Sequence, residues 1–237
     1  MARFIAIMSG KGGVGKTTTS VNLGLAMHHT GKDVVLLDGN LSSPNLSLHL
    51  GKSFFPITIH DVMSDIHPIS NAVYEHYTGL KIIPADISVS AMKLVNFDLL
   101  EKHLQDLHLV SDYVVIDGSP GLGRESTSLI DISDELLIVT NQDVASVHDA
   151  KRVIDFAKKR GKTVLGILVN KYKKRYYKLT LEDIEDITKT VVLGTIQEDK
   201  RFEKSHHKKT PYLHIYPKRK PSKTYKELAE MITGRVL

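Results

Sequence analysis

GKGGVGKTT, residues 10–18, fits the phosphate-binding loop pattern G-x-x-x-x-G-K-[ST] and decides the fold of this 237-residue chain. The apolar run from Phe4 to Met8 precedes the loop and predicts a buried parallel strand. A helical pattern follows the loop and ends at Gly31, a residue type that commonly ends helices. A strand, this loop and a helix in that order predict a site for a nucleoside triphosphate. The alternative is a glycine-rich turn that holds no ligand.

The residue types in the loop suit phosphate chemistry. Glycines let the backbone turn tightly and present N–H groups to phosphate oxygens, and the following helix adds the positive end of its dipole. Lys16 is expected to reach the terminal phosphates, and the Thr17 hydroxyl is expected to ligate Mg²⁺. The nucleotide-binding residues predicted in this stretch are Gly10, Lys11, Gly12, Gly13, Val14, Gly15, Lys16, Thr17 and Thr18.

A second lysine, Lys11, stands near the start of the loop, although a chain does not need it to hold its own phosphates. KGGVGKTT resembles the deviant phosphate-loop signature of the MinD/ParA family of ATPases, and the chain as a whole is most similar to archaeal-type MinD proteins. The resemblance implies that ATP and Mg²⁺ join two copies into a homodimer, in which Lys11 reaches the partner's phosphates. It also implies catalytic roles for Lys11 and Lys16. The alternative is that Lys11 is a solvated charge.

Apolar strand-like runs alternate with helical patterns along the chain, which is typical of a doubly wound, mostly parallel sheet. We therefore predict one three-layer α/β domain, residues 1–237, and the resemblance makes it a P-loop NTPase fold of the deviant Walker A class. Further strands are predicted at 33–37, 80–84, 113–117, 136–139, 164–169 and 191–196. Helices are predicted at about 90–108, 144–160, 180–189 and 222–233, short helices near 46–50 and 59–63, and a looser segment at 52–79.

Acidic residues end two of these strands, at the edge where ligands of such sheets bind. Asp117 follows the run Val114-Val115-Ile116 and has the Walker-B position, where a carboxylate orders Mg²⁺. The predicted metal site consists of Thr17, Asp117 and Asp38. The alternative for Asp117 is an ordinary aspartate at the end of a strand.

The segment Asp38-Gly39-Asn40 departs from the D-x-D of the family, whose second aspartate is associated with positioning the attacking water. Asn40 has that position here, and an amide cannot accept a proton as a carboxylate does. Asp38 and Asn40 stay candidate catalytic residues, because phosphoryl transfer depends mainly on positioning and charge stabilisation. We predict normal binding of ATP and Mg²⁺ with slow or partner-stimulated hydrolysis. The alternative is that Asp38 or another carboxylate substitutes for the missing one.

Two other segments resemble functional parts of the family. Residues 117–123 resemble the switch motif after the Walker-B aspartate, although Pro120 comes three residues after that aspartate instead of two. Asn170 and Lys171 resemble the base-recognition position, where an asparagine amide can pair with a donor and an acceptor on adenine. The alternative for Asn170 is a turn residue at the end of a strand. Asp149 is a candidate for the dimer interface.

The composition excludes several classes of protein. The chain has no cysteine, which excludes disulfides, thiolate zinc sites and cysteine-ligated iron–sulfur clusters. We expect a cytoplasmic protein, because no signal peptide precedes the first strand and no apolar run approaches the roughly 18 residues of a membrane span. We also expect no membrane-targeting helix after the last predicted helix. The histidine pairs at 28–29 and 206–207 are interpreted as solvated surface, because adjacent helical residues do not share a face.

The net charge of +5 conceals an asymmetry. Residues 1–150 contain 9 Lys and Arg against 17 Asp and Glu, whereas residues 151–237 contain 23 against 10. A basic C-terminal half would attract an anionic partner such as DNA, RNA, acidic lipid or an acidic protein. The alternative is an ordinary lysine-rich surface.

Three functions are compatible with these patterns. The first is an ATP-binding switch of the MinD/ParA type that dimerises around ATP and Mg²⁺ and positions or recruits a cellular partner, which the sequence does not name. The second is a ParA-like partition ATPase that binds DNA nonspecifically through the basic half. The third is a metabolic ligase built on the same loop, which Lys11 disfavours because a self-contained pocket would not require it.

Overall fold

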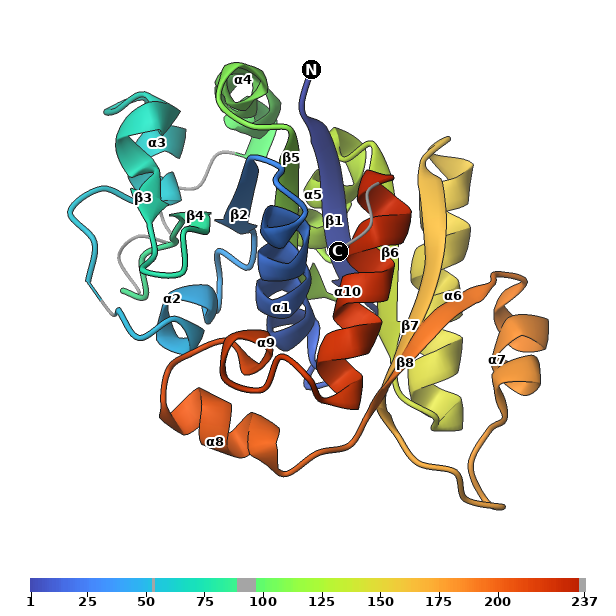
Figure 1. Cartoon of the computed structure of the whole chain (residues 1–237). Coiled ribbons are helices and arrows are strands. Elements are labelled where there is room, and N and C mark those ends of the chain that lie inside the picture. Colours follow the sequence, from blue (N-terminus) through green and yellow to red (C-terminus); the bar gives the residue numbers. More distant parts are fainter. Residues whose placement is uncertain (53, 89–96, 235–237) are drawn as a thin grey trace.

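One sheet organises the computed structural model of the chain, which describes residues 1–52, 54–88 and 97–234 (Figure 1). The strand order is β3-β4-β2-β5-β1-β6-β7-β8, and neighbours are parallel except for β3 with β4. The strands are β1 (Arg3–Ser9), β2 (Val34–Asp38), β3 (Tyr74–Glu75), β4 (Lys81–Ile83), β5 (Tyr113–Pro120), β6 (Glu135–Thr140), β7 (Thr163–Tyr172) and β8 (Val192–Gln197).

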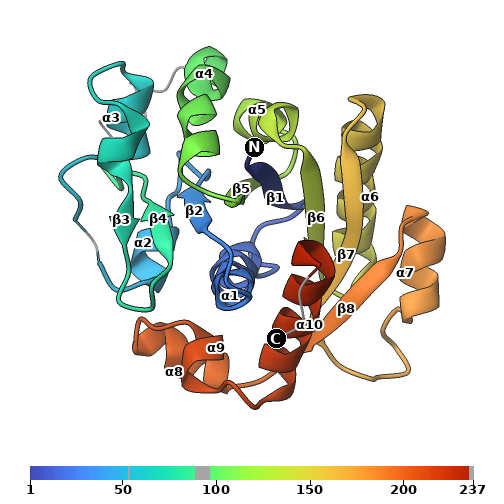
Figure 2. The same cartoon turned by 45° about the horizontal axis from the view of Figure 1, so that its top comes forward.

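Helices cover both faces of this sheet (Figures 1 and 2). On one face, α1 (Lys16–His29) and α10 (Lys220–Thr233) pack against each other, and on the other α5 (Arg124–Ile132) and α6 (Val144–Lys159) lie against the strands. Within the described ranges, no helix is both long enough and apolar enough to cross a membrane. The shorter helices are α2 (Leu46–His49), α3 (Ile59–Met63), η1 (Ile69–Ala72), η3 (Phe97–Leu99), α4 (Leu100–Leu104), η4 (Gln105–Leu109), α7 (Leu181–Thr188), α8 (Arg201–His207) and α9 (Tyr212–Ile215).

The buried residues of β1 explain why helices are needed on both faces. Successive side chains of a strand point to opposite faces, and nearly all of those in β1 are apolar. Ile5 and Ile7 pack with residues of α1 and α10, while Phe4, Ala6 and Met8 pack with residues of α5 and α6. Each face therefore has its own apolar core, and the predicted three-layer, doubly wound fold is confirmed.

Most predicted elements occur within a residue or two of their expected bounds, but one helix does not. The helix predicted at 90–108 falls partly on residues 89–96, which lie outside the described residues, and its remainder is divided into η3, α4 and η4. Among the described residues, five elements were not predicted: β3, η1, α5, α8 and α9. β3 has only two residues, and the exposed, charged sequence of α8 has no apolar face of helical period that would reveal it.

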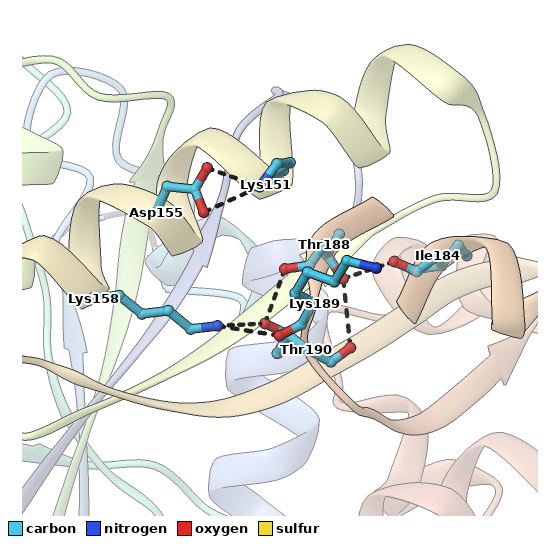
Figure 3. A network of polar contacts seen from close by, with 7 residues as sticks. All are labelled: Lys151, Asp155, Lys158, Ile184, Thr188, Lys189 and Thr190. Carbon is cyan, nitrogen blue, oxygen red and sulfur yellow. Dashed lines mark hydrogen bonds and ion pairs between the residues drawn. The ribbon is translucent and has the colours of Figure 1, made fainter. Parts of the chain in front are cut away.

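A lysine joins the ends of two neighbouring helices, α6 and α7 (Figure 3). Lys158 Nζ at the end of α6 donates to the carbonyl oxygen of Lys189 at 3.2 Å and to Thr190 Oγ1 at 3.1 Å. Lys189 ends α7 with a φ of 51°, in the left-handed region. Because the last carbonyls of a helix have no partner inside it, this ammonium group satisfies one of them and fixes α7 against α6.

Candidate nucleotide site

The glycine-rich loop lies at the carboxyl end of β1 and leads directly into α1. β1 lies between β5 and β6, with β2 beyond β5. The chain therefore leaves β1 toward one half of the sheet and later returns to build the other half, and such a reversal opens a crevice at the carboxyl edge. The first N–H groups of α1 have no partners within the helix, and the positive end of its dipole lies at the same place. This end of the sheet is therefore suited to bind an anion.

Two glycines of the loop are required by close contacts. A Cβ at Gly10 would lie 2.2 Å from the carbonyl carbon of Asp149, so the backbone of α6 packs directly on the loop. Gly15 has a φ of 102°, and its Cβ would lie 2.0 Å from Nδ2 of Asn170 at the carboxyl end of β7. The loop is thus held between α6 and β7.

Lys16 is the buried cation of the loop. Its Nζ donates to Ser9 Oγ at 3.0 Å, and the Ser9 hydroxyl in turn donates to the carbonyl oxygen of Lys11 at 2.7 Å. Burial lowers the pKa of Lys16, and the nearby Asp117 opposes that shift. The ammonium group is therefore held inside the loop, where it can bind a phosphate oxygen.

The two predicted carboxylates lie side by side. Asp38 at the end of β2 is directly opposite Asp117 in β5, and both are fully buried. Asp38 accepts from the backbone N–H of Asn40 at 3.2 Å and of Leu46 at 3.1 Å. Ser20 Oγ donates to Asp117 Oδ1 at 2.8 Å, whereas Asp117 Oδ2 has no hydrogen-bond partner among the described residues.

Burial raises the pKa of both carboxyl groups. For Asp38 the second cause is the negative charge of Asp117. At Asp117 the hydroxyls of Thr17 and Ser20 and the charge of Lys16 work in the opposite direction. Two adjacent buried carboxylates are costly unless a cation offsets their repulsion.

These features fit a magnesium ion. Carboxylate and hydroxyl oxygens are ligands that Mg²⁺ prefers, and the unpaired Oδ2 of Asp117 and the Thr17 hydroxyl would hold it. Asp38 would add its charge from the neighbouring strand. When bound, the ion neutralises negative charge on the phosphates. In the described part of the chain, no group of three or more His, Asp or Glu side chains is arranged as another metal site.

The loop after β2 is tied to the first turn of α5. Asn40 Nδ2 donates to the carbonyl oxygen of Ser43 at 2.6 Å, and Asn45 Nδ2 donates to the same oxygen at 2.7 Å. Ser42 then donates from its N–H at 2.9 Å and from its hydroxyl at 2.8 Å to the Glu125 carboxylate, at the start of α5. The segment that carries Asn40 is therefore tied to the first turn of α5, which directly follows the segment predicted as a switch.

Asn170 and Lys171 contact the glycine-rich loop. Asn170 Nδ2 donates to the carbonyl oxygen of Val14 at 2.7 Å, its Oδ1 accepts from the Lys171 N–H, and Lys171 Nζ donates to the carbonyl oxygen of Gly13 at 2.9 Å. An asparagine amide has two donor hydrogens and two acceptor lone pairs, so one of each is left for a base edge. Base recognition by Asn170 stays a prediction.

A cavity of about 630 Å³ brings most of the predicted residues together. Residues that the sequence analysis missed form its far side: His49 in α2, and Phe202, Glu203 and His206 in α8. His206 is exposed, which agrees with its interpretation as surface, and it also lines the cavity, which the sequence analysis did not predict. The polar sequence of α8 does not indicate that its residues line a cavity, because only the tertiary fold brings residues 202–206 to the loop at 12–18. The predicted residues in the lining are Gly12, Gly13, Gly15, Lys16, Thr17, Thr18, Asn40, Asn170 and Lys171.

Lys11 lies outside this lining. Its side chain is 52% exposed, and its Nζ lies 4.0 Å from Asp143 Oδ1, the carboxylate that caps the start of α6. Asp149, the candidate interface residue, lies on the first half of α6, and its carboxylate is 3.5 Å from Arg152. Both residues are on the side of the loop that faces α6.

A phosphate-binding loop between a central parallel strand and a helix, beside two strand-end carboxylates, defines a P-loop NTPase. The family model ParA, described as NUBPL iron-transfer P-loop NTPase, matches residues 1–233. The chain belongs to the ParA family, which agrees with the resemblance of its KGGVGKTT loop.

Three relatives show the extent of the similarity. An uncharacterised ATP-binding protein of Methanocaldococcus jannaschii is 34% identical over 234 residues, which cover 99% of this chain and 89% of the relative. The cell division ATPase MinD of Pyrococcus furiosus is 30% identical with a TM-score of 0.93, over 99% of each chain. The septum site-determining protein MinD of Pyrococcus horikoshii, solved in complex with Mg-ADP, is 30% identical with a TM-score of 0.92, over 98% of this chain and 96% of that one.

Proposed function

We propose that this protein is an ATP-dependent switch of the MinD type, which dimerises around ATP and Mg²⁺ and in that state recruits or positions a cellular partner. The family and the fold make it a MinD-like ATPase, and ATP and Mg²⁺ are the ligands that its site fits. The observation that carries the proposal of a dimer is the position of Lys11.

The Lys11 side chain can turn away from its own chain and reach a second copy at little cost. An exposed ion pair of 4.0 Å to Asp143 contributes at most about 1 kcal/mol, so little free energy is lost when the side chain moves. Two exposed apolar residues accompany it. Val144 follows Asp143 and is 57% exposed, and Leu122 is 37% exposed in the segment that Gly121 ties to β1. A second copy that covers this surface would bury both apolar side chains and receive Lys11 at its own phosphates.

Lys11→Ala should prevent the dimer without preventing nucleotide binding. We expect particle mass, measured by light scattering, to double when wild type is moved from ADP to ATP with Mg²⁺, and the mass of Lys11→Ala to stay that of a monomer. Lys159→Ala, which removes an exposed lysine at the other end of α6, is the matched control and should dimerise like wild type. A wild type that stays monomeric at saturating ATP, or a Lys11→Ala variant that dimerises equally well, would contradict the proposal.

Asn40→Asp should speed up hydrolysis. The substitution supplies the carboxylate that the family usually carries at this position, and a positioned proton acceptor typically contributes about 100-fold or more to a rate. Because an aspartate also loses the bond that Asn40 donates to Ser43, we expect a smaller gain of roughly tenfold in phosphate release. Asn45→Asp is the control, because Asn45 lines the same cavity and donates to the same oxygen. Faster release by wild type than by Asn40→Asp would show that another group already does this work.

Nonspecific DNA binding is a second candidate function, favoured by one loop. Between β7 and α7, Lys174 and Arg175 are exposed beside Tyr176 and Tyr177, which are 100% and 66% exposed. Such cations would neutralise phosphates, and the affinity would fall steeply with salt. Gel retardation of a duplex at two salt concentrations tests this function. No retardation at low salt with ATP and Mg²⁺ would remove it.

A further inference from the structure

Two histidines from distant parts of the chain meet at the rim of the nucleotide cavity. The His206 ring in α8 lies edge-on to the His49 ring in α2, with centroids 4.6 Å apart and an angle of 70° between planes. His206 Nε2 lies 3.3 Å from Thr18 Oγ1 in the first turn of α1, and the two atoms share a hydrogen bond. His49 and Thr18 therefore fix the direction in which the His206 ring points.

The place of this contact indicates which part of a nucleotide lies beside it. Thr17 faces Asp117, on the metal side of the cavity. Thr18 is one residue further along the helix, about 100° around its axis, and faces α8 instead. The other α8 residues in the lining, Phe202 and Glu203, share the cavity with Asn170, the residue predicted to recognise the base. His206 thus lies between the metal side and the base side, where the phosphate nearest the nucleoside would be.

We propose that His206, oriented by His49 and Thr18, binds the α-phosphate of the nucleotide as an imidazolium cation. In the ligand-free protein His206 Nε2 shares its hydrogen bond with Thr18 Oγ1, and an imidazolium can instead donate its one Nε2 hydrogen to a phosphate oxygen. Such charge-assisted bonds are stronger than neutral ones. The inference rests on the proposed function, because it assigns a further binding residue to the same site. It predicts that nucleotide binding takes up a proton.

The charges around His206 support this assignment. Burial lowers the pKa of His206, and Glu203 on the same helix raises it, so at neutral pH the ring without a ligand is largely uncharged. Burial and His206 together lower the pKa of His49 to about 4, so His49 stays neutral and acts only by packing. The other charged groups in the lining are Lys16 in α1, Lys171 at the end of β7, and Glu198 and Asp199 before α8. A phosphate adds negative charge at short range and would raise the pKa of the imidazole toward and above neutral pH.

The test is calorimetric titration of the full chain with Mg-ADP at pH 6.0 and pH 8.0, in buffers of different ionisation enthalpy. We expect wild type to take up protons on binding. At pH 6.0 its affinity for Mg-ADP should exceed that of His206→Gln by about tenfold. His206→Gln keeps a donor of similar size but cannot be charged, so both effects should vanish.

Three controls separate binding from structure. His207→Gln changes the adjacent exposed histidine and should behave like wild type. His49→Phe keeps an aromatic ring beside His206 and should keep the proton uptake. Adenosine, which has no phosphate, should bind without any difference between wild type and His206→Gln. Equal proton uptake by wild type and His206→Gln would overturn the inference. Failure of every variant, wild type included, to bind Mg-ADP would instead reject the proposed function.

Discussion

Asp117→Asn is expected to abolish most of the gain in nucleotide affinity that Mg²⁺ provides, and at the same time to stabilise the protein without ligand. Asp117 offers the unpaired carboxylate oxygen of the site, and an amide is a much poorer magnesium ligand. Loss of groups that hold or orient a metal typically costs about 10- to 100-fold in metal affinity. The stabilisation arises because the substitution leaves Asp38 without a neighbouring buried charge.

The sign of the pH dependence follows from the raised pKa values. Above the ordinary aspartate pKa of about 4, the native state holds more protons than the unfolded state until the raised pKa values are passed. Stability of the ligand-free protein therefore falls as pH rises through that window, and the full penalty is present above the raised pKa values. Asp117→Asn should remove the part of this penalty that arises from the repulsion between the two carboxylates, and should therefore raise the free energy of unfolding.

The measurement is the thermal midpoint from pH 4 to pH 8, with and without Mg-ADP. Asp117→Asn should raise the midpoint of the ligand-free protein at pH 7, flatten its decline with pH, and remove the further increase that Mg²⁺ gives with ADP. Asp106→Asn changes an exposed aspartate at the other end of the molecule and should match wild type in all three respects. A ligand-free Asp117→Asn protein less stable than wild type at pH 7 would show that the Lys16–Asp117 attraction outweighs the repulsion.

Gly10→Ala is expected to destabilise the protein and displace the phosphate-binding loop. The added methyl group would lie 2.2 Å from the carbonyl carbon of Asp149 and 2.3 Å from its oxygen. These are backbone atoms of a long helix, so they cannot rotate away as a side chain would. Overpacking of this kind costs about 1–3 kcal/mol, which lowers the thermal midpoint by roughly 2–10 °C in a chain of this size.

Gly12→Ala is the matched control for Gly10→Ala. Gly12 lies two residues away in the same loop, its φ is not positive, and a Cβ there would meet nothing within 4 Å. Its thermal midpoint should therefore equal that of wild type or exceed it slightly, because alanine restricts the unfolded chain. Mg-ADP affinity should fall for Gly10→Ala, because the loop moves off α6. Equal midpoints for the two variants would show that α6 yields to the added methyl group.

The sequence by itself determined the class of the fold and the phosphate end of the site. Short-range patterns were sufficient, because the period of apolar residues reports which faces are buried and the loop motif occupies contiguous residues. Asp117 could be placed for the same reason, since it ends a recognisable apolar run. Its neighbour in space, Asp38, followed from the rule that parallel strands end at one edge.

Only the tertiary structure decided what meets the loop from elsewhere. The contact of Gly10 with Asp149 spans about 140 residues, and that of Thr18 with His206 almost 190, and neither leaves a periodic trace in the chain. The mutual repulsion of Asp38 and Asp117 likewise depends on their complete burial, which local composition does not fix. Contacts of this kind are set by how helices pack on the sheet, so residues such as His206 acquire a role in the site that their own neighbours in sequence do not indicate.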